Sequence, residues 1–240
     1  MPRTGLARAL SKLGFCSRSK AVELIQAGQV RLNGRVCRDP EKPVQLDQDK
    51  VSVDGAEVDR PAFRYLMLNK PRGLVTTASD EQGRDTVFSC FEGHALPHLS
   101  PVGRLDKASE GLLLFTNDNA WANRVTDPAT HLPKTYHVQV SALVDDTLLK
   151  KLAEGVVDQG ERLELREIRR LRQGEKNTWL EITLDEGRNR HIRRVLAAND
   201  LEVLRLVRIA IGNLSLGDLA KGRWRELRDS EIRRWLPSHR

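Results

Sequence analysis

Hydrophobic positions in the first part of the chain predict two short helices and a small sheet. Apolar residues recur with helical spacing over 6–13, and a second helical pattern follows Ser17, a residue type that favours the N-cap. Short apolar runs are then separated by the hairpin signals Asn33-Gly34 and Asp54-Gly55. Residues 1–60 are therefore expected to form a small domain of their own.

From residue 65 onward the pattern predicts longer strands with helices between them. The expected strands lie at 65–68, 74–77, 99–102, 112–115, 134–140, 162–168 and 179–184, with two or three more within 204–227. The expected helices lie at 86–91, 117–125, 147–154, 191–198 and 229–236. Many strands joined by short connections favour the α+β class, so residues 61–240 are expected to form a larger domain with a mixed, mostly antiparallel sheet flanked by helices.

The overall composition favours a polyanionic partner without naming one. The 240 residues carry a net charge of +7, and no apolar run is long enough to span a bilayer. The first residues lack the apolar core of a signal peptide, so we expect a cytoplasmic protein. Cys16, Cys37 and Cys90 have no paired spacing, and neither a disulfide frame nor a metal site is expected.

The positive charge is concentrated at the start of the chain. Residues 1–38 hold eight Lys and Arg residues and one acidic residue, so the remainder is balanced. This segment resembles the α-L RNA-binding domain, because the string RLNGRV follows a helix of the form CSRSKAVELIQAG. The resemblance implies phosphate contacts at four basic residues, Arg18, Lys20, Arg31 and Arg35. The alternative is a solvated basic face on a small folding unit.

A charged turn before a buried strand presents one carboxylate. Asp106 stands between Arg104 and Lys107, and neighbouring cations favour the ionised form of an acid, which suits a nucleophile. The apolar run 112–115 that follows predicts a buried strand, which gives the turn a rigid mount. The alternative is that Asp106 only caps or pairs within a loop.

Two further features bear on a site. Tyr136 shares a face of the strand 134–140 with Val138 and Val140, so its ring either packs in the core or forms the floor of a pocket on which a base stacks. The helix expected at 191–198 carries or adjoins four arginines, Arg188, Arg190, Arg193 and Arg194. Such a group requires an anion, either RNA phosphate or a carboxylate such as Asp106, unless it is a solvated basic rim.

Five strings, in order, resemble the RsuA/RluB/RluE/RluF group of RNA pseudouridine synthases. They are LNKPRGLVTT, VGRLDKASEGLLLFTND, KTYHVQV, ITLDEGRNRHIRR and LVRIAIGNLSLGDLAKGRWREL. The resemblance covers the chain from residue 65 to residue 227, and the N-terminal α-L domain is also common in that group. It implies that a uridine in structured RNA, expected to be ribosomal, is isomerised to pseudouridine by a monomer that needs no cofactor.

The same resemblance assigns roles to particular residues. Asp106 is implied as the catalytic carboxylate, Tyr136 as the ring beneath the target base, and Arg193 as the ion-pair partner of Asp106. Arg104 is implied to lie beside the flipped nucleotide, and further RNA contacts are expected from three flanking cations, Lys107, Arg188 and Arg190. Whether the carboxylate attacks the base at carbon 6, attacks the anomeric carbon or removes a sugar proton stays open.

Two other functions compete with this one. A ribosome-assembly factor would bind RNA through the basic N-terminal segment without catalysis. A hydrolase would need two carboxylates about 5 to 9.5 Å apart or an acidic metal-binding cluster, and only Glu110 lies near Asp106 in the sequence. The C-terminal stretch is similar to the RluE branch, which favours large-subunit over small-subunit RNA as the substrate.

Overall fold

The computed structural model describes residues 3–59, 62–77, 80, 82–185 and 187–233. The chain divides into two compact units. One comprises Met1–Tyr65, Phe91–Ser100 and Phe115–Ala120, and the other comprises Leu66–Cys90, Pro101–Leu114 and Trp121–Arg240. Residues 60 and 61, at which the sequence predicts the end of the first domain, lie outside the described residues.

The N-terminal part of the first unit has the predicted two helices and small sheet. Helices α1 (Leu6–Lys12) and α2 (Arg18–Gln26) pack together, and the Ser17 Oγ accepts a hydrogen bond from the Lys20 N–H at 3.2 Å as the N-cap of α2. The sheet order is β3-β2-β5-β6, formed by β2 (Val30–Leu32), β3 (Arg35–Val36), β5 (Val51–Val53) and β6 (Ala56–Glu57). A separate pair joins β1 (Thr4–Gly5) to β4 (Pro43–Val44).

Turn chemistry and burial explain why this small unit forms. Asn33 and Gly34 have φ of 51° and 81°, and Asp54 and Gly55 have φ of 49° and 86°. Two consecutive positive values are those of a tight hairpin turn, which Asn-Gly and Asp-Gly favour. The core beneath the helices is built from fully buried apolar side chains, namely Leu6, Leu10, Ala21, Ile25, Val30 and Val44. Both hairpins predicted from the sequence are confirmed.

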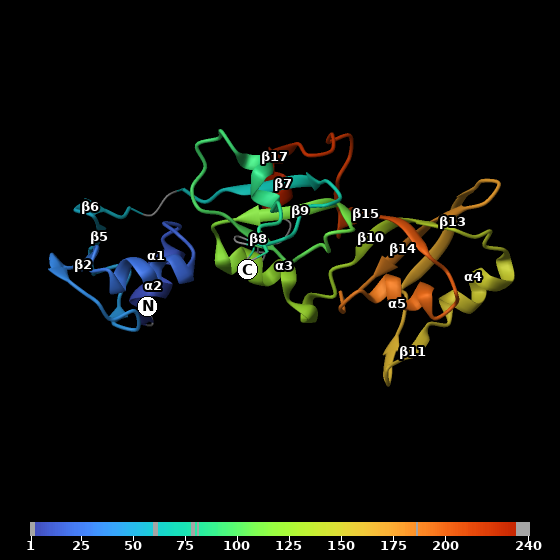
Figure 1. The fold of residues 1–240 in the computed structure, drawn as a ribbon, viewed down its shortest axis with the longest axis horizontal. Coiled ribbons are helices and arrows are strands. Elements are labelled where there is room, and N and C mark those ends of the chain that lie inside the picture. Colours follow the sequence, from blue (N-terminus) through green and yellow to red (C-terminus); the bar gives the residue numbers. More distant parts are fainter. Residues whose placement is uncertain (1–2, 60–61, 78–79, 81, 186, 234–240) are drawn as a thin grey trace. The chain divides into compact units, whose positions relative to one another are not determined.

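The second unit is built on a nine-stranded sheet. The strand order is β13-β14-β10-β15-β9-β7-β17, with β16 paired to β15 and β8 paired to β9 (Figure 1). The strands are β7 (Tyr65–Lys70), β8 (Ser100–Val102), β9 (Glu110–Thr116), β10 (Lys134–Val140), β13 (Glu167–Gln173), β14 (Thr178–Leu184), β15 (Val203–Ile211), β16 (Leu214–Ser215) and β17 (Trp224–Glu226). Strand β15 runs parallel to β9, whereas β10, β13 and β14 pair antiparallel. The expected α+β class with a mixed, mostly antiparallel sheet is confirmed.

Short helices and one hairpin flank this sheet. The helices are α3 (Asn119–Thr126), α4 (Asp146–Ala153), α5 (His191–Ala197) and α6 (Asp229–Arg233), with 3₁₀ turns η1 (Val87–Phe91) and η2 (Pro128–Thr130). A two-stranded hairpin of β11 (Val156–Asp158) and β12 (Glu161–Leu163) contacts α5, and Figure 1 shows the two side by side. Residues 234–236 of the predicted closing helix lie outside the described residues.

Strand β9 is the buried mount that the sequence predicts behind Asp106. All seven of its residues are buried, because it lies inside the sheet between β15 and β7. Gly111 has a φ of 101° and pairs with Arg208, and a Cβ placed on it would collide with the Arg208 carbonyl oxygen. The close parallel approach of β9 to β15 therefore requires glycine at this position.

Two strand predictions are wrong for reasons of tertiary contact. Residues 74–77 do not return along β7; Val75 makes an isolated parallel bridge with Thr86, and β7 pairs with β17 instead. The Gly73 N–H donates to the Lys107 carbonyl at 2.8 Å, so the chain after β7 is tied to the charged turn. The run 162–168 is split, because its first residues pair with β11 and its last residues with β14.

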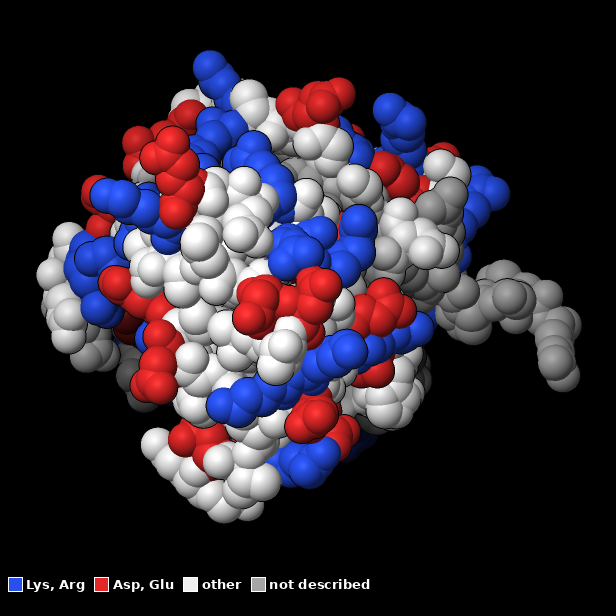
Figure 2. Space-filling model, turned by 90° about the vertical axis from the view of Figure 1, so that its right-hand side faces the viewer, with Lys and Arg blue, Asp and Glu red and all other residues white. Residues whose placement is uncertain are grey.

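On one face of the molecule, charged side chains of both signs are intermixed. Figure 2 shows a face on which Lys and Arg side chains alternate with Asp and Glu. At the edge strand β13, Arg169 pairs with Glu181 at 2.6 Å and Arg170 pairs with Asp146 at 2.9 Å. In the part of the chain that the structure describes, no helix has the length and apolar character needed to cross a membrane.

Candidate active site

The charged turn between β8 and β9 is held from below by backbone and hydroxyl contacts. Arg104, Asp106 and Lys107 are exposed on it, and the Asp106 side chain has 45% of its surface accessible. The Thr76 hydroxyl donates to the Leu105 carbonyl at 2.7 Å, and the Ser109 N–H donates to the Asp106 carbonyl at 2.9 Å. The turn thus presents its carboxylate outward while its backbone is fixed.

Lys70 lies buried beneath the same turn. Its ammonium donates to three backbone carbonyls, those of Ser109 at 2.8 Å, Pro71 at 3.1 Å and Asp106 at 3.2 Å. Burial lowers the pKa of Lys70 to about 8, although the charges of Asp106 and Glu110 oppose the shift. Because its side chain is inaccessible, it is a support of the turn.

A cavity of about 360 Å³ opens beside Asp106, which is the size of a small-molecule site. It is lined by the predicted catalytic set of Asp106, Tyr136 and Arg193, together with Arg104, Arg188 and Arg190. A second hollow, lined in part by Thr76, Arg84, Lys107 and Asn189, also includes Asp106. The carboxylate therefore stands where two hollows meet.

Tyr136 packs in the core and also lines the cavity. It is 8% exposed, and on β10 it shares the buried face with Val138 and Val140. It also lines the cavity, so one surface of the ring packs in the core while another borders the open space. The β10–β15 ladder shifts register between Thr135 and Tyr136, which face Ala210 and Arg208, so the ladder is irregular beside this side chain.

The two arginines nearest the carboxylate occupy different positions from those expected. The Arg190 Nη1 lies 3.9 Å from the Asp106 Oδ2, whereas the Arg193 Nη2 donates to the Ala108 carbonyl at 3.2 Å. Among the described residues, Asp106 is thus ion-paired with Arg190 and not with Arg193, so the predicted direct pair is not formed in this structure. Burial lowers the pKa of Arg193, as do the charges of Arg190 and Arg72, while Asp106 raises it.

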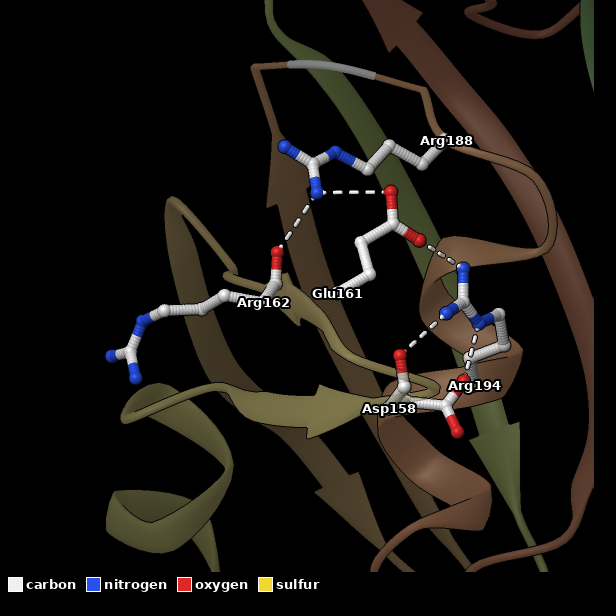
Figure 3. Close-up of polar contacts among 5 residues, drawn as sticks. All are labelled: Asp158, Glu161, Arg162, Arg188 and Arg194. Atoms are coloured by element: carbon white, nitrogen blue, oxygen red, sulfur yellow. Dashed lines mark hydrogen bonds and ion pairs between the residues drawn. The ribbon is translucent and has the colours of Figure 1, made fainter.

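The other two arginines of the group are neutralised by the β11–β12 hairpin (Figure 3). Arg188 donates through Nη1 to Glu161 at 3.0 Å and to the Arg162 carbonyl at 2.9 Å. Arg194 contacts Asp158 at 2.5 Å and Glu161 at 2.6 Å. The sequence pointed to RNA or Asp106 as the balancing anion, and these two hairpin carboxylates were missed.

The basic residues predicted to contact RNA in the first unit are accessible. Arg18, Lys20, Arg31 and Arg35 are all exposed. Lys20 pairs with Glu23 at 2.9 Å, and Arg31 donates to the Gly34 carbonyl at 3.1 Å. These are surface contacts of little strength, so they leave the cations available to phosphate. In the described residues there is no group of three or more His, Cys, Asp or Glu side chains arranged to hold a metal ion.

Comparison with known proteins gives consistent matches. Residues 64–198 match the family model described as RNA pseudouridylate synthase, and residues 4–49 match the S4 domain. A protein of Aquifex aeolicus (strain VF5) named as an uncharacterized RNA pseudouridine synthase is 40% identical over 97% of this chain and 93% of its own length. Ribosomal large subunit pseudouridine synthase B of Bacillus subtilis (strain 168) is 35% identical over 95% of this chain and 94% of its own. A solved structure titled as a pseudouridylate synthase has a TM-score of 0.67 at 28% identity, covering 98% of this chain and 100% of that one.

Proposed function

Because the chain belongs to the RNA pseudouridine synthase family, in which its motifs had placed it, we propose that it isomerises one specific uridine of ribosomal RNA. The enzyme class is an isomerase, and the S4 domain at its start binds RNA.

The observation that carries the proposal is the shared cavity of Asp106, Tyr136 and Arg193. The reaction breaks the bond from uracil N1 to ribose C1′ and forms one from C5 to C1′, while the proton of C5 is lost and N1 gains one. Because atoms and electrons balance within the nucleotide, the reaction needs no second reactant. The proposed role of the Asp106 carboxylate is to attack carbon 6 of the base, to attack the anomeric carbon, or to remove a sugar proton.

The other residues of the cavity hold the base in place. Tyr136 offers an aromatic surface on which uracil stacks, and such stacking is worth about 1–3 kcal/mol per base. It keeps the detached base from leaving while the base turns from N1 to C5. Arg190 offsets the charge of Asp106, and Arg193 closes the wall beside Ala108. The Nε of Arg193 is buried without a hydrogen-bond partner among the described residues, so this group has a donor that the described residues do not use.

RNA contacts are proposed on both units. A base inside a helix is out of reach, and extruding it costs a few kcal/mol that backbone contacts offset. Around the cavity we assign these contacts to Arg104, Lys107 and Arg190, which are exposed. Arg188 belongs to the same set with a smaller contribution, because its Nη1 already serves Glu161 and the Arg162 carbonyl.

The proposed substrate is the RNA of the large ribosomal subunit. The Bacillus subtilis relative named above carries that substrate in its name, and it aligns with nearly the whole of this chain. We further propose that the enzyme acts as a monomer in the cytoplasm. Mapping pseudouridine in ribosomal RNA from cells with and without the protein tests this substrate. If cells without the protein lack a pseudouridine of small-subunit RNA instead, the assignment to large-subunit RNA is contradicted.

The test of the reaction uses ribosomal RNA tritiated at uridine carbon 5. The protein is expected to release tritium to water, whereas Asp106→Asn is expected to lower the rate at least about 10⁴-fold, as for loss of other essential catalytic groups. Asp218→Asn is the matched control, because Asp218 is an exposed carboxylate outside the cavity lining. Equal release by Asp106→Asn would remove Asp106 from its role. Absence of release by the parent on total ribosomal RNA would leave an RNA-binding assembly factor.

A further inference from the structure

The β11–β12 hairpin reaches the segment 188–194 at both of its ends. Glu161 accepts from Arg188 through Oε1 at 3.0 Å and from Arg194 through Oε2 at 2.6 Å, so one carboxylate bridges the two arginines (Figure 3). Asp158 adds a second carboxylate and its own backbone carbonyl to Arg194, at 2.5 and 3.1 Å. Between the bridged ends stand Arg190 and Arg193, which line the cavity.

We propose that Glu161 is a positioning residue for the isomerisation: by binding Arg188 and Arg194 it fixes the segment that places Arg190 and Arg193 beside Asp106. This inference rests on the proposed function of the same cavity. Glu161 itself is not among the cavity's lining residues, so it acts through the arginines.

Charge gives the first reason. Four arginines within seven positions repel one another, and the pKa of Arg193 is lowered by burial and by the charge of Arg190. The carboxylates of the β11–β12 hairpin pair with two of these four arginines, Arg188 and Arg194. Without these carboxylates, Arg188 and Arg194 would add two unbalanced positive charges to the segment that carries Arg190 and Arg193. The hairpin therefore lowers the repulsion within the segment that carries Arg190, the arginine paired with Asp106.

Backbone conformation gives a second, independent reason. Arg190 has a φ of 50° and ψ of 30° at the start of α5, a left-handed conformation that a long side chain rarely adopts. Such a conformation persists where the surrounding structure enforces it. Arg188 and Arg194 are the anchored residues on either side of Arg190, and their side chains are only 33% and 20% exposed in these pairs. A partly buried, multiply bonded network holds geometry better than an exposed pair does.

The experiment compares Glu161→Gln with Glu164→Gln in the full-length protein. Glutamine keeps the shape of Glu161 and removes the charge shared by the two arginines. Glu164 is the matched control, because it lies on the same stretch and pairs with an arginine, Arg162, that is outside the segment 188–194. The measured quantities are the dissociation constant for ribosomal RNA and the single-turnover rate constant of tritium release with enzyme in saturating excess.

The expected result is a rate constant lowered between about 10-fold and 100-fold for Glu161→Gln, the range typical of a small displacement of catalytic groups. RNA affinity is expected to change less than about 3-fold. Glu164→Gln is expected to match the parent in both quantities. Arg194→Gln is measured as well, and in the double variant Glu161→Gln with Arg194→Gln the combined loss should be smaller than the sum of the two single losses, since the two side chains share one contact.

Partial unfolding does not imitate this result, because a single-turnover rate constant at saturating enzyme is independent of how much of the excess is folded. Thermal unfolding of each variant is recorded alongside. An unchanged rate constant for Glu161→Gln, or a change confined to RNA affinity or thermal stability, would overturn the inference. Asp106→Asn distinguishes failure of the proposed function from failure of the positioning role. If Asp106→Asn is inactive and Glu161→Gln is as fast as the parent, the proposed function stands and the positioning role of Glu161 is wrong.

Discussion

Lys70 places a buried positive charge beneath the turn of Asp106, and all three of its hydrogen bonds go to backbone carbonyls. A buried ammonium costs free energy unless its donors are satisfied, and here they are satisfied by the turn itself. The position of Asp106 is thereby tied to the protonation of a residue that never meets the substrate.

The lowered pKa of Lys70 predicts a dependence of stability on pH. Between about 8, its pKa in the folded chain, and 10.5, its usual value, the unfolded chain holds a proton that the folded chain has released. The free energy of unfolding should therefore rise with pH across this window, by at most roughly 1.4 kcal/mol per pH unit from this group. Urea unfolding of the parent and of Lys70→Met at several values between about pH 7.5 and 10 measures the difference. If the free energy of unfolding of the parent rises with pH no more than that of Lys70→Met, the low pKa of Lys70 is contradicted.

Substitutions at Tyr136 separate packing from stacking. Tyr136→Phe retains the ring and should bind RNA and unfold like the parent, because the hydroxyl is a small part of the buried surface. Tyr136→Ala removes a ring that is 8% exposed and should lower the free energy of unfolding by about 3–5 kcal/mol. It should also weaken binding of the RNA by about 10-fold or more. Chemical denaturation and RNA titration check both; equal affinity of the Ala and Phe variants would exclude stacking.

Among elements, β9 determines where the active turn stands, and Gly111 is its narrowest point. Gly111→Ala should destabilise the protein by more than the roughly 1–2 kcal/mol expected from a positive φ alone, because the new Cβ would meet backbone atoms of Arg208. Gly73→Ala isolates the φ effect, since Gly73 has a φ of 102°, close to that of Gly111, and a Cβ at this position would meet nothing within 4 Å. Unfolding midpoints in urea compare the two. If both glycine variants lose a similar amount of stability, β9 and β15 can move apart at little cost in free energy.

The elements that the sequence predicts correctly are those whose signal is local. The caps, hairpin turns and alternating strands such as 134–140 depend on neighbouring residues, and the structure has them. The run 74–77 looks like a strand by the same criteria, but Gly73 and Thr76 bond to the turn around Asp106 instead. A contact made across 29 positions in the chain leaves no local pattern.

The same limit applies to the site. The motif strings placed Asp106, Tyr136 and Arg193 around one cavity, and the structure brings them there. Their catalytic roles stay predictions. The support of Lys70 and the bridge of Glu161 were not foreseen, because Lys70 resembles any basic turn residue and Glu161 meets Arg188 across 27 positions. Charge balance was the available signal: four crowded arginines required acids from elsewhere in the chain.

For the whole molecule, the excess positive charge of residues 1–38 predicts how binding responds to salt. Replacing Arg18, Lys20, Arg31 and Arg35 by Gln should weaken binding and reduce the slope of log affinity against log salt by about 3, if each cation meets one phosphate. Replacing Arg169 and Arg170, which already pair with acids, should alter the slope far less. Filter binding between about 50 and 200 mM salt measures the slopes. An unchanged slope for the first variant would move the RNA contacts away from this segment.

The parallel neighbours β9 and β15 also bear on the order in which the enzyme is made. Glu110 and Gly111 pair with Val207 and Arg208, so the strand behind Asp106 lacks one of its neighbours until residues 207 and 208 have left the ribosome. Pairings of such long sequence separation form late. The hairpins near the start of the chain join residues only a few positions apart and need not wait. During synthesis, recognition of RNA should therefore be acquired before the capacity to modify it.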